Sequence, residues 1–189
     1  MKIFAARMTS ILTHPFILSA IATIISADQH DASPFLFRTL LVILFTLGTV
    51  AVGFAWWHVR TGRWAHIDAV APEERKVLNL FLTLLLLISS GLAWKYFPEP
   101  ELAYGLLISG IAIVAAMLVS PWLKISLHSC FGAVAAGIIW PKFYAIEIGL
   151  VISALVYWAR IVMKRHTLLE MLAGSVIGIG CATLYQMLA

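Results

Sequence analysis

Residues 77–94 read VLNLFLTLLLLISSGLAW, a stretch of 18 residues that contains no charged side chain. A helix that crosses the hydrocarbon core of a bilayer needs about 20 apolar residues. The stretch therefore predicts a membrane-spanning helix, and the rest of the chain repeats its pattern.

The composition of the whole chain points the same way. Of the 189 residues, 62% are hydrophobic and only 12% are charged, whereas an average soluble domain has about 25% charged residues. A soluble fold of this composition would lack the polar residues that cover a core. These values exclude a disordered chain and a nucleic-acid-binding tail. They predict an all-α fold, a polytopic membrane helix bundle with membrane lipids as its surroundings.

Seven apolar segments divide the chain, which predicts six to seven transmembrane helices in one membrane-embedded domain, residues 1–189. They are 9–27, 35–57, 77–94, 102–120, 125–140, 143–162 and 167–188. The first is the weakest because His14-Pro15 interrupts it, and the fifth is short. Gly, Ala and Ser recur in the fifth and seventh segments, and such small residues let helices approach closely. We therefore expect these two segments in the interior of the bundle.

Three polar loops contain most of the chemically useful side chains: 58–76, 121–128 and 160–170. Two predicted spans separate the first loop from the second, and two more separate the second from the third. All three loops are therefore expected on one side of the membrane, where their side chains can converge.

The third loop has the clearest pattern. His166 and Glu170 are four residues apart, so on a helix they share one face. A carboxylate there accepts a hydrogen bond from the imidazole and raises the basicity of its other nitrogen. Arg160, at the end of the preceding span, has a guanidinium suited to holding an oxyanion. The alternative is a basic loop flank with one incidental helix pair.

The other two loops give weaker signals. Ser126 and His128 stand where a helix begins, and free N–H groups at a helix start bind anions. Arg75 and Lys76 are adjacent cations at the start of a span, seven and eight residues after Asp68. The alternatives are an isolated histidine and a positively charged loop.

Together the three loops resemble the motifs of the type 2 phosphatidic acid phosphatase superfamily, which includes bacterial acid phosphatases and vanadium haloperoxidases. The third family motif, Ser-Arg, five residues, His, three residues, Asp, becomes Ala159-Arg160, His166 and Glu170 with its spacing kept. The second, Pro-Ser-Gly-His, keeps Ser126 and His128. The first, Lys, six residues, Arg-Pro, keeps only Arg75. The resemblance covers 68–189 and leaves 1–57 outside.

The resemblance implies a role for each matching residue. His166 would attack phosphorus to give a phosphohistidine, Glu170 would orient it, and His128 would protonate the leaving oxygen. The residues that would bind phosphate are Arg160, Arg75, Ser126, Lys76 and Lys124. Asp68 stands at the family's lysine position, where it would repel phosphate, and Lys76, Lys124 or Lys164 would compensate. The reaction would need no metal and no other cofactor.

The expected substrate is a phosphate on a lipid, because the loops lie at a membrane surface. Candidates are phosphatidic acid, phosphatidylglycerol phosphate, and a polyprenyl phosphate or diphosphate. Ten of the 13 Lys and Arg residues fall on the side of the three loops. The positive-inside rule then places this face in the cytoplasm, in a bacterial inner membrane.

Two other functions stay open at this point. A haem or metal protein would use histidines within spans, for which only His14 and His128 are placed. A non-catalytic lipid-binding or transport protein on the same fold would explain the loss of residues from the first two motifs. Cys130 and Cys181 lie in apolar segments and give neither metal-site spacing nor a disulfide framework.

Overall fold

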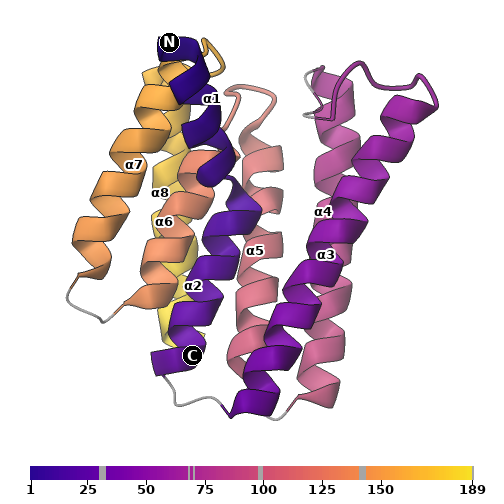
Figure 1. Ribbon diagram of the computed structural model, residues 1–189, viewed down its shortest axis with the longest axis vertical. Helices are drawn as coiled ribbons and strands as arrows, with labels where there is room; N and C mark the ends of the chain where they lie inside the picture. The colour runs from indigo at the N-terminus through magenta and orange to yellow at the C-terminus, as the bar shows by residue number, and fades with distance from the viewer. Residues whose placement is uncertain (30–32, 68, 70, 98–99, 141–143, 189) are drawn as a thin grey trace.

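The computed structural model describes residues 1–29, 33–67, 69, 71–97, 100–140 and 144–188. The regular structure of these residues is entirely helical (Figure 1). The helices are α1 (Lys2–Leu12), α2 (Pro15–Gln29), α3 (Pro34–Arg60), α4 (Pro72–Tyr96), α5 (Pro100–Val119), α6 (Leu127–Ile139), α7 (Ala145–Val162) and α8 (Leu168–Leu188). The all-α polytopic bundle predicted from composition is confirmed.

Five helices within the described ranges are long and apolar enough to cross a membrane: α3, α4, α5, α7 and α8. A sixth crossing is available if α1 and α2 act as one bent span. The expected fifth span, 125–140, is helical only over Leu127–Ile139. Its 13 residues rise about 20 Å, less than the roughly 30 Å of a hydrocarbon core.

The N-terminal segment is broken where the sequence places His14-Pro15. Proline lacks the N–H that would continue the helix and disfavours helical backbone in the residue before it. Thr13 ends α1, its N–H and hydroxyl both donating to Thr9 O, and Pro15 begins α2. The two helices meet at an angle of 47°. The elbow turns α2 onto α6 and leaves α1 against α7.

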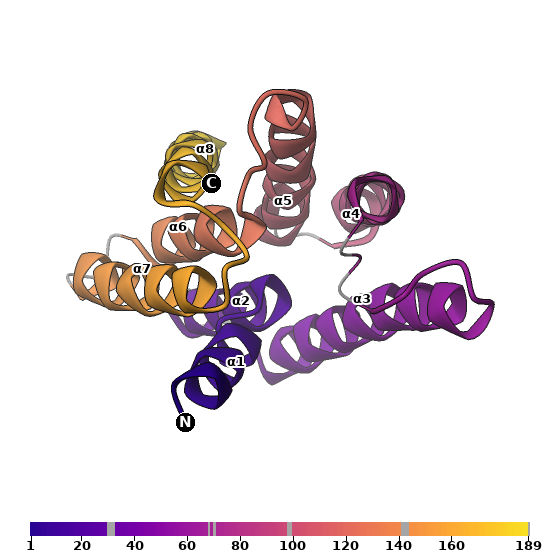
Figure 2. The same cartoon turned by 90° about the horizontal axis from the view of Figure 1, so that it is seen from above.

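The interior of the bundle is built on α6, which packs against α8, α2 and α7 (Figure 2). Its contact with α8 depends on glycine. A Cβ on Gly174 would lie 2.6 Å from the Ser126 carbonyl oxygen, and one on Gly178 would collide with the Cys130 carbonyl. The close approach of these two segments, predicted from their small residues, is therefore present in the structure.

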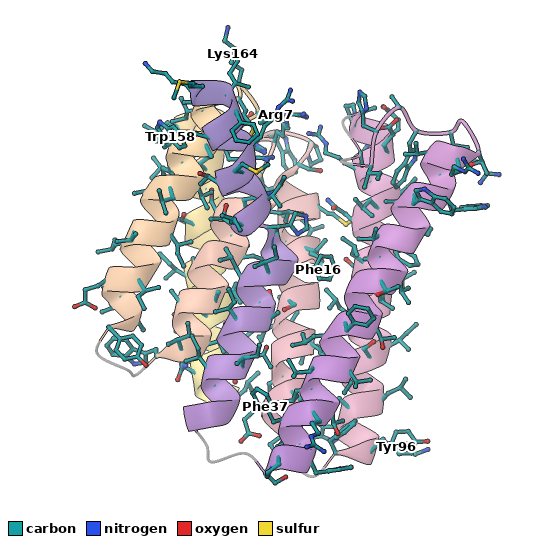
Figure 3. All side chains as sticks on the ribbon, viewed as in Figure 1. Arg7, Phe16, Phe37, Tyr96, Trp158 and Lys164 are labelled. Atoms are coloured by element: carbon teal, nitrogen blue, oxygen red, sulfur yellow. The ribbon has the colours of Figure 1, made fainter. Side chains whose placement is uncertain are left out.

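The connections α3–α4, α5–α6 and α7–α8 lie at one end of the bundle, together with the N-terminus (Figure 1). In Figure 3, Arg7 and Lys164 mark this end, and Phe37 and Tyr96 mark the other. The three polar loops thus share one end, which we call the loop end.

Candidate functional site

The centre of the site is the pair of His166 and Glu170. His166 precedes α8, and Glu170 lies in its first turn. The His166 Nδ1 is 2.9 Å from the Glu170 Oε2, and the two side chains are only 7% and 16% exposed. The same carboxylate oxygen accepts the Thr167 N–H at 3.1 Å. The pairing expected from the four-residue spacing is formed, and the start of α8 holds it in place.

The surroundings favour a neutral imidazole on His166. Burial, Arg160 and Lys124 lower its pKa to about 4, although the hydrogen bond to Glu170 acts in the opposite direction. An ionised carboxylate is only an acceptor, so the Nδ1 of His166 carries the proton. In the neutral ring, the lone pair is then on Nε2, where a nucleophile needs it.

Arg160 supplies a cation from the last turn of α7. Its Nη1 donates a hydrogen bond to the Ser10 hydroxyl at 3.0 Å, and its charge acts on both His166 and His128. The structure therefore brings Arg160 together with both predicted catalytic histidines.

The predicted site residues of the α5–α6 region do not all face the same way: Lys124 and His128 line a large cavity between the helices, whereas Ser126 is buried in the packing. Lys124 Nζ also donates to the Arg165 carbonyl at 2.9 Å. Burial and the neighbouring Arg75 lower the pKa of Lys124. The effect of Arg75 on Lys124 indicates that the start of α4 contributes positive charge to the site.

Ser126 does not face the cavity. It is fully buried, and its hydroxyl accepts the N–H of Ser129 as the N-cap of α6. Its own N–H donates to the Glu170 carbonyl oxygen at 3.3 Å. The Ser126 hydroxyl is therefore not positioned to contact a phosphate in the cavity. Its hydrogen bonds instead connect the start of α6 to the start of α8.

The start of α4 provides the remaining predicted cations. Arg75 and Lys76 both line the cavity, from the side opposite α7. Glu74, next to them, is occupied in the α4 cap, where it accepts the N–H groups of Ala65 and Ala71. Asp68 lies outside the described residues.

The cavity itself has a volume of about 1490 Å³ and two chemically different parts. At the loop end it is lined by cations and imidazoles: Arg7, Arg75, Lys76, Lys124, His128, Arg160, Arg165 and His166. Below them its walls are mainly apolar side chains of α2, α3, α4 and α5, among them Phe16, which lies about half-way down the bundle (Figure 3). It ends near Leu36 and Leu102, at the opposite end. The positively charged part of the cavity at the loop end thus continues into a long, mainly apolar part, which we call the slot.

Sequence reasoning missed the contribution of the N-terminal helices. Arg7, Ser10 and His14 line the same cavity. The His14 ring lies edge-on to His128, with ring centroids 5.5 Å apart. The only signal was the His14-Pro15 interruption, which marks a polar residue at an elbow inside an apolar segment.

The chain matches no family model, no curated protein and no solved structure. Over the part of the chain that the structure describes, no three His, Cys, Asp or Glu side chains gather as a metal site.

Proposed function

We propose that the protein is an integral-membrane lipid phosphatase that hydrolyses a phosphate monoester or diphosphate on a lipid. The observation that carries this proposal is the His166–Glu170 pair at the cationic end of a cavity whose remainder is apolar. Such a cavity suits a ligand with an anionic head and a hydrocarbon tail.

The first chemical step is the attack of His166 Nε2 on phosphorus. An N–P bond forms as the P–O bond to the lipid breaks, and protonated His128 gives its proton to the departing oxygen. Burial and Arg160 lower the pKa of His128 well below 6.5, so the negative charge of the bound phosphate has to favour this protonated form. The lipid alcohol and a phosphohistidine result. Glu170 keeps its hydrogen bond to Nδ1–H and stabilises the positive charge that develops on the ring.

The second step hydrolyses the phosphohistidine. Neutral His128 takes a proton from water as the water oxygen attacks phosphorus and the N–P bond breaks. Inorganic phosphate leaves, and both histidines return to their starting states. Arg160, Arg75, Lys76 and Lys124 favour both steps, because phosphoryl transfer spreads negative charge over the phosphoryl oxygens.

The direct test measures phosphate release from a panel of lipid phosphates in proteoliposomes, with and without a chelator. We expect release to be independent of added metal. His166→Ala should lower kcat at least a thousandfold, since it removes the nucleophile. His66→Ala, the same substitution in the exposed α3–α4 loop, serves as the matched control. Equal rates in wild type and His166→Ala would refute the nucleophile assignment.

A second candidate is a non-catalytic protein that binds or moves lipid phosphates. The depth of the cavity favours it, because the slot continues to the end of the bundle opposite the cations. Binding of phosphatidic acid without phosphate release, unaffected by His166→Ala, would support this function over the phosphatase.

We further propose that the loop end faces the cytoplasm of a bacterial inner membrane. The proposal rests on charge: ten of the 13 Lys and Arg residues belong to this end by sequence. The C-terminus of α8 lies at the other end (Figure 1). Alkaline phosphatase fused to the C-terminus should then be active, and a fusion in the α3–α4 loop inactive. The reverse pattern would overturn the orientation.

A further inference from the structure

The N-terminal helix α1 touches the site although the motifs lie elsewhere in the chain. Ser10 is 9% exposed, and its hydroxyl accepts the hydrogen bond from Arg160 Nη1 at 3.0 Å. The Ser10 backbone lies beside the ring of His128, whose protonated form it favours. One residue of α1 therefore contacts both the principal cation and the proposed acid.

Arg160 needs such a contact because of its position. It projects from the last turn of α7 on a long, flexible side chain. A guanidinium recognises an oxyanion through a planar fork of N–H groups, so its usefulness depends on the orientation of that plane. A hydrogen bond from Nη1 to a buried hydroxyl fixes one edge of the plane and leaves the cation on the cavity wall.

The packing of α1 explains why Ser10 lies beside Arg160. α1 packs along α7, and the elbow at Pro15 directs α2 away onto α6. Ser10 is therefore held at the level of Arg160, one turn before His14 reaches His128.

We propose that Ser10 is a positioning residue of the site, which orients the Arg160 guanidinium for the phosphoryl group. The inference rests on the proposed function and extends it, because it assigns a residue of α1 to the phosphate-binding site. Ser10 touches no reacting atom. It acts through Arg160.

The test compares Ser10→Ala and Ser10→Thr in the wild-type background and in Arg160→Lys, which keeps the charge but lacks the planar fork. We expect Ser10→Ala to lower kcat about tenfold to a hundredfold in the wild type. Ser10→Thr keeps a hydroxyl and should recover most of that loss. In Arg160→Lys the added effect of Ser10→Ala should be less than about twofold, because the orientation it secures is already lost.

Ser175→Ala is the matched control. It removes a hydrogen bond of 2.9 Å between Tyr157 of α7 and Ser175 of α8, and so loosens α7 without touching Arg160. An equal loss of kcat in Ser175→Ala, or an equal effect of Ser10→Ala in both backgrounds, would show that the serine only supports packing and would overturn the inference.

Binding separates this inference from the proposed function. Dioleoyl phosphatidic acid is titrated in phosphatidylcholine nanodiscs and followed by tryptophan fluorescence. If the wild type binds this lipid but releases no phosphate, the phosphatase proposal fails alone, and Ser10→Ala should still weaken binding about tenfold. In such an inactive protein, unchanged binding in Ser10→Ala would overturn the positioning role, as would a wild type that binds no lipid phosphate.

Discussion

At the scale of single residues, the site depends on an imidazole that is both buried and oriented. Burial and two cations favour the neutral ring of His166, while Glu170 fixes which nitrogen carries the proton. The cations act on the pKa of His166 through their charge, whereas Glu170 fixes the tautomer through a hydrogen bond. Separate mutations can therefore test the two effects.

Glu170→Gln removes the negative charge but keeps an oxygen that can accept from Nδ1–H. We expect kcat to fall by up to about 10⁴-fold, the cost of the corresponding acid-to-amide change at the carboxylate that orients a triad histidine. Glu170→Asp keeps the charge and should retain more activity than the glutamine variant. Steady-state kinetics of the two variants check this, with thermal unfolding to monitor the α8 cap that Glu170 also makes. A glutamine variant as active as wild type would contradict the orienting role.

In a plot of kcat/KM against pH, the decrease on the acidic side should occur at an unusually low pH. The neutral ring of His166 is required, and its pKa is lowered from 6.5 to about 4. The free-enzyme kcat/KM should therefore not lose activity near pH 6.5 from this group and should decline as the pH falls toward 4. Removing a nearby cation raises the pKa, so Lys124→Gln should move this decrease to higher pH. A decrease fixed near pH 6.5 in both proteins would contradict this assignment.

The same lowered pKa has a consequence for stability. Between pH 6.5 and about 4, the unfolded chain binds more protons at His166 than the folded chain does. This group therefore makes the folded state less stable as the pH falls through that interval. His166→Gln should weaken the dependence of unfolding free energy on pH there.

At the scale of elements, the sequence was informative wherever a contact is local. The His166–Glu170 pair is local, formed between the residues before α8 and its first turn, and the glycines of α8 predict close packing of this helix. The family resemblance implies a phosphate-binding role for Ser126, but a serine at a helix start can equally well cap the helix, and the structure shows its hydroxyl in that role. The bond from Arg160 to Ser10 spans 150 residues, and no local pattern predicts a contact of that range.

The packing of α6 on α8 gives a prediction at this scale. In Gly178→Ala the added methyl group would collide with the Cys130 carbonyl, so the helices must separate. We expect a loss of about 1–3 kcal/mol in unfolding free energy, the usual cost of overpacking. Gly180→Ala on the same helix meets no atom within 4 Å and should be neutral or slightly stabilising. Chemical unfolding in detergent distinguishes them, and equal stabilities would contradict the close packing.

At the scale of the whole molecule, α3 and α4 form one part, which meets the rest of the bundle where α3 contacts α2 and where α4 packs on α5 (Figure 2). The cavity lies between these parts and has cations from both: Arg75 and Lys76 from α4, Arg160 from α7. Along α3 its lining extends from Leu36 to Ala55, 19 residues or about 28 Å. This nearly equals the hydrocarbon thickness of a bilayer, so a tail that fills the slot passes well beyond one leaflet.

Two glycines of α3 allow the slot to be tested directly. Gly48 lines the cavity and Gly53 does not, yet a Cβ on either meets no atom within 4 Å. Gly48→Phe should therefore be accommodated by the fold while its ring occupies the slot. We expect kcat/KM for long-chain lipid phosphates to fall about tenfold or more, since the lost tail contacts contribute binding energy in proportion to their buried apolar area. Dioctanoyl phosphatidic acid should be affected much less, because its short chains stop above the ring. Gly53→Phe should leave both substrates unchanged, and a Gly48→Phe enzyme whose kcat/KM does not distinguish long from short chains would contradict a tail seated in the slot.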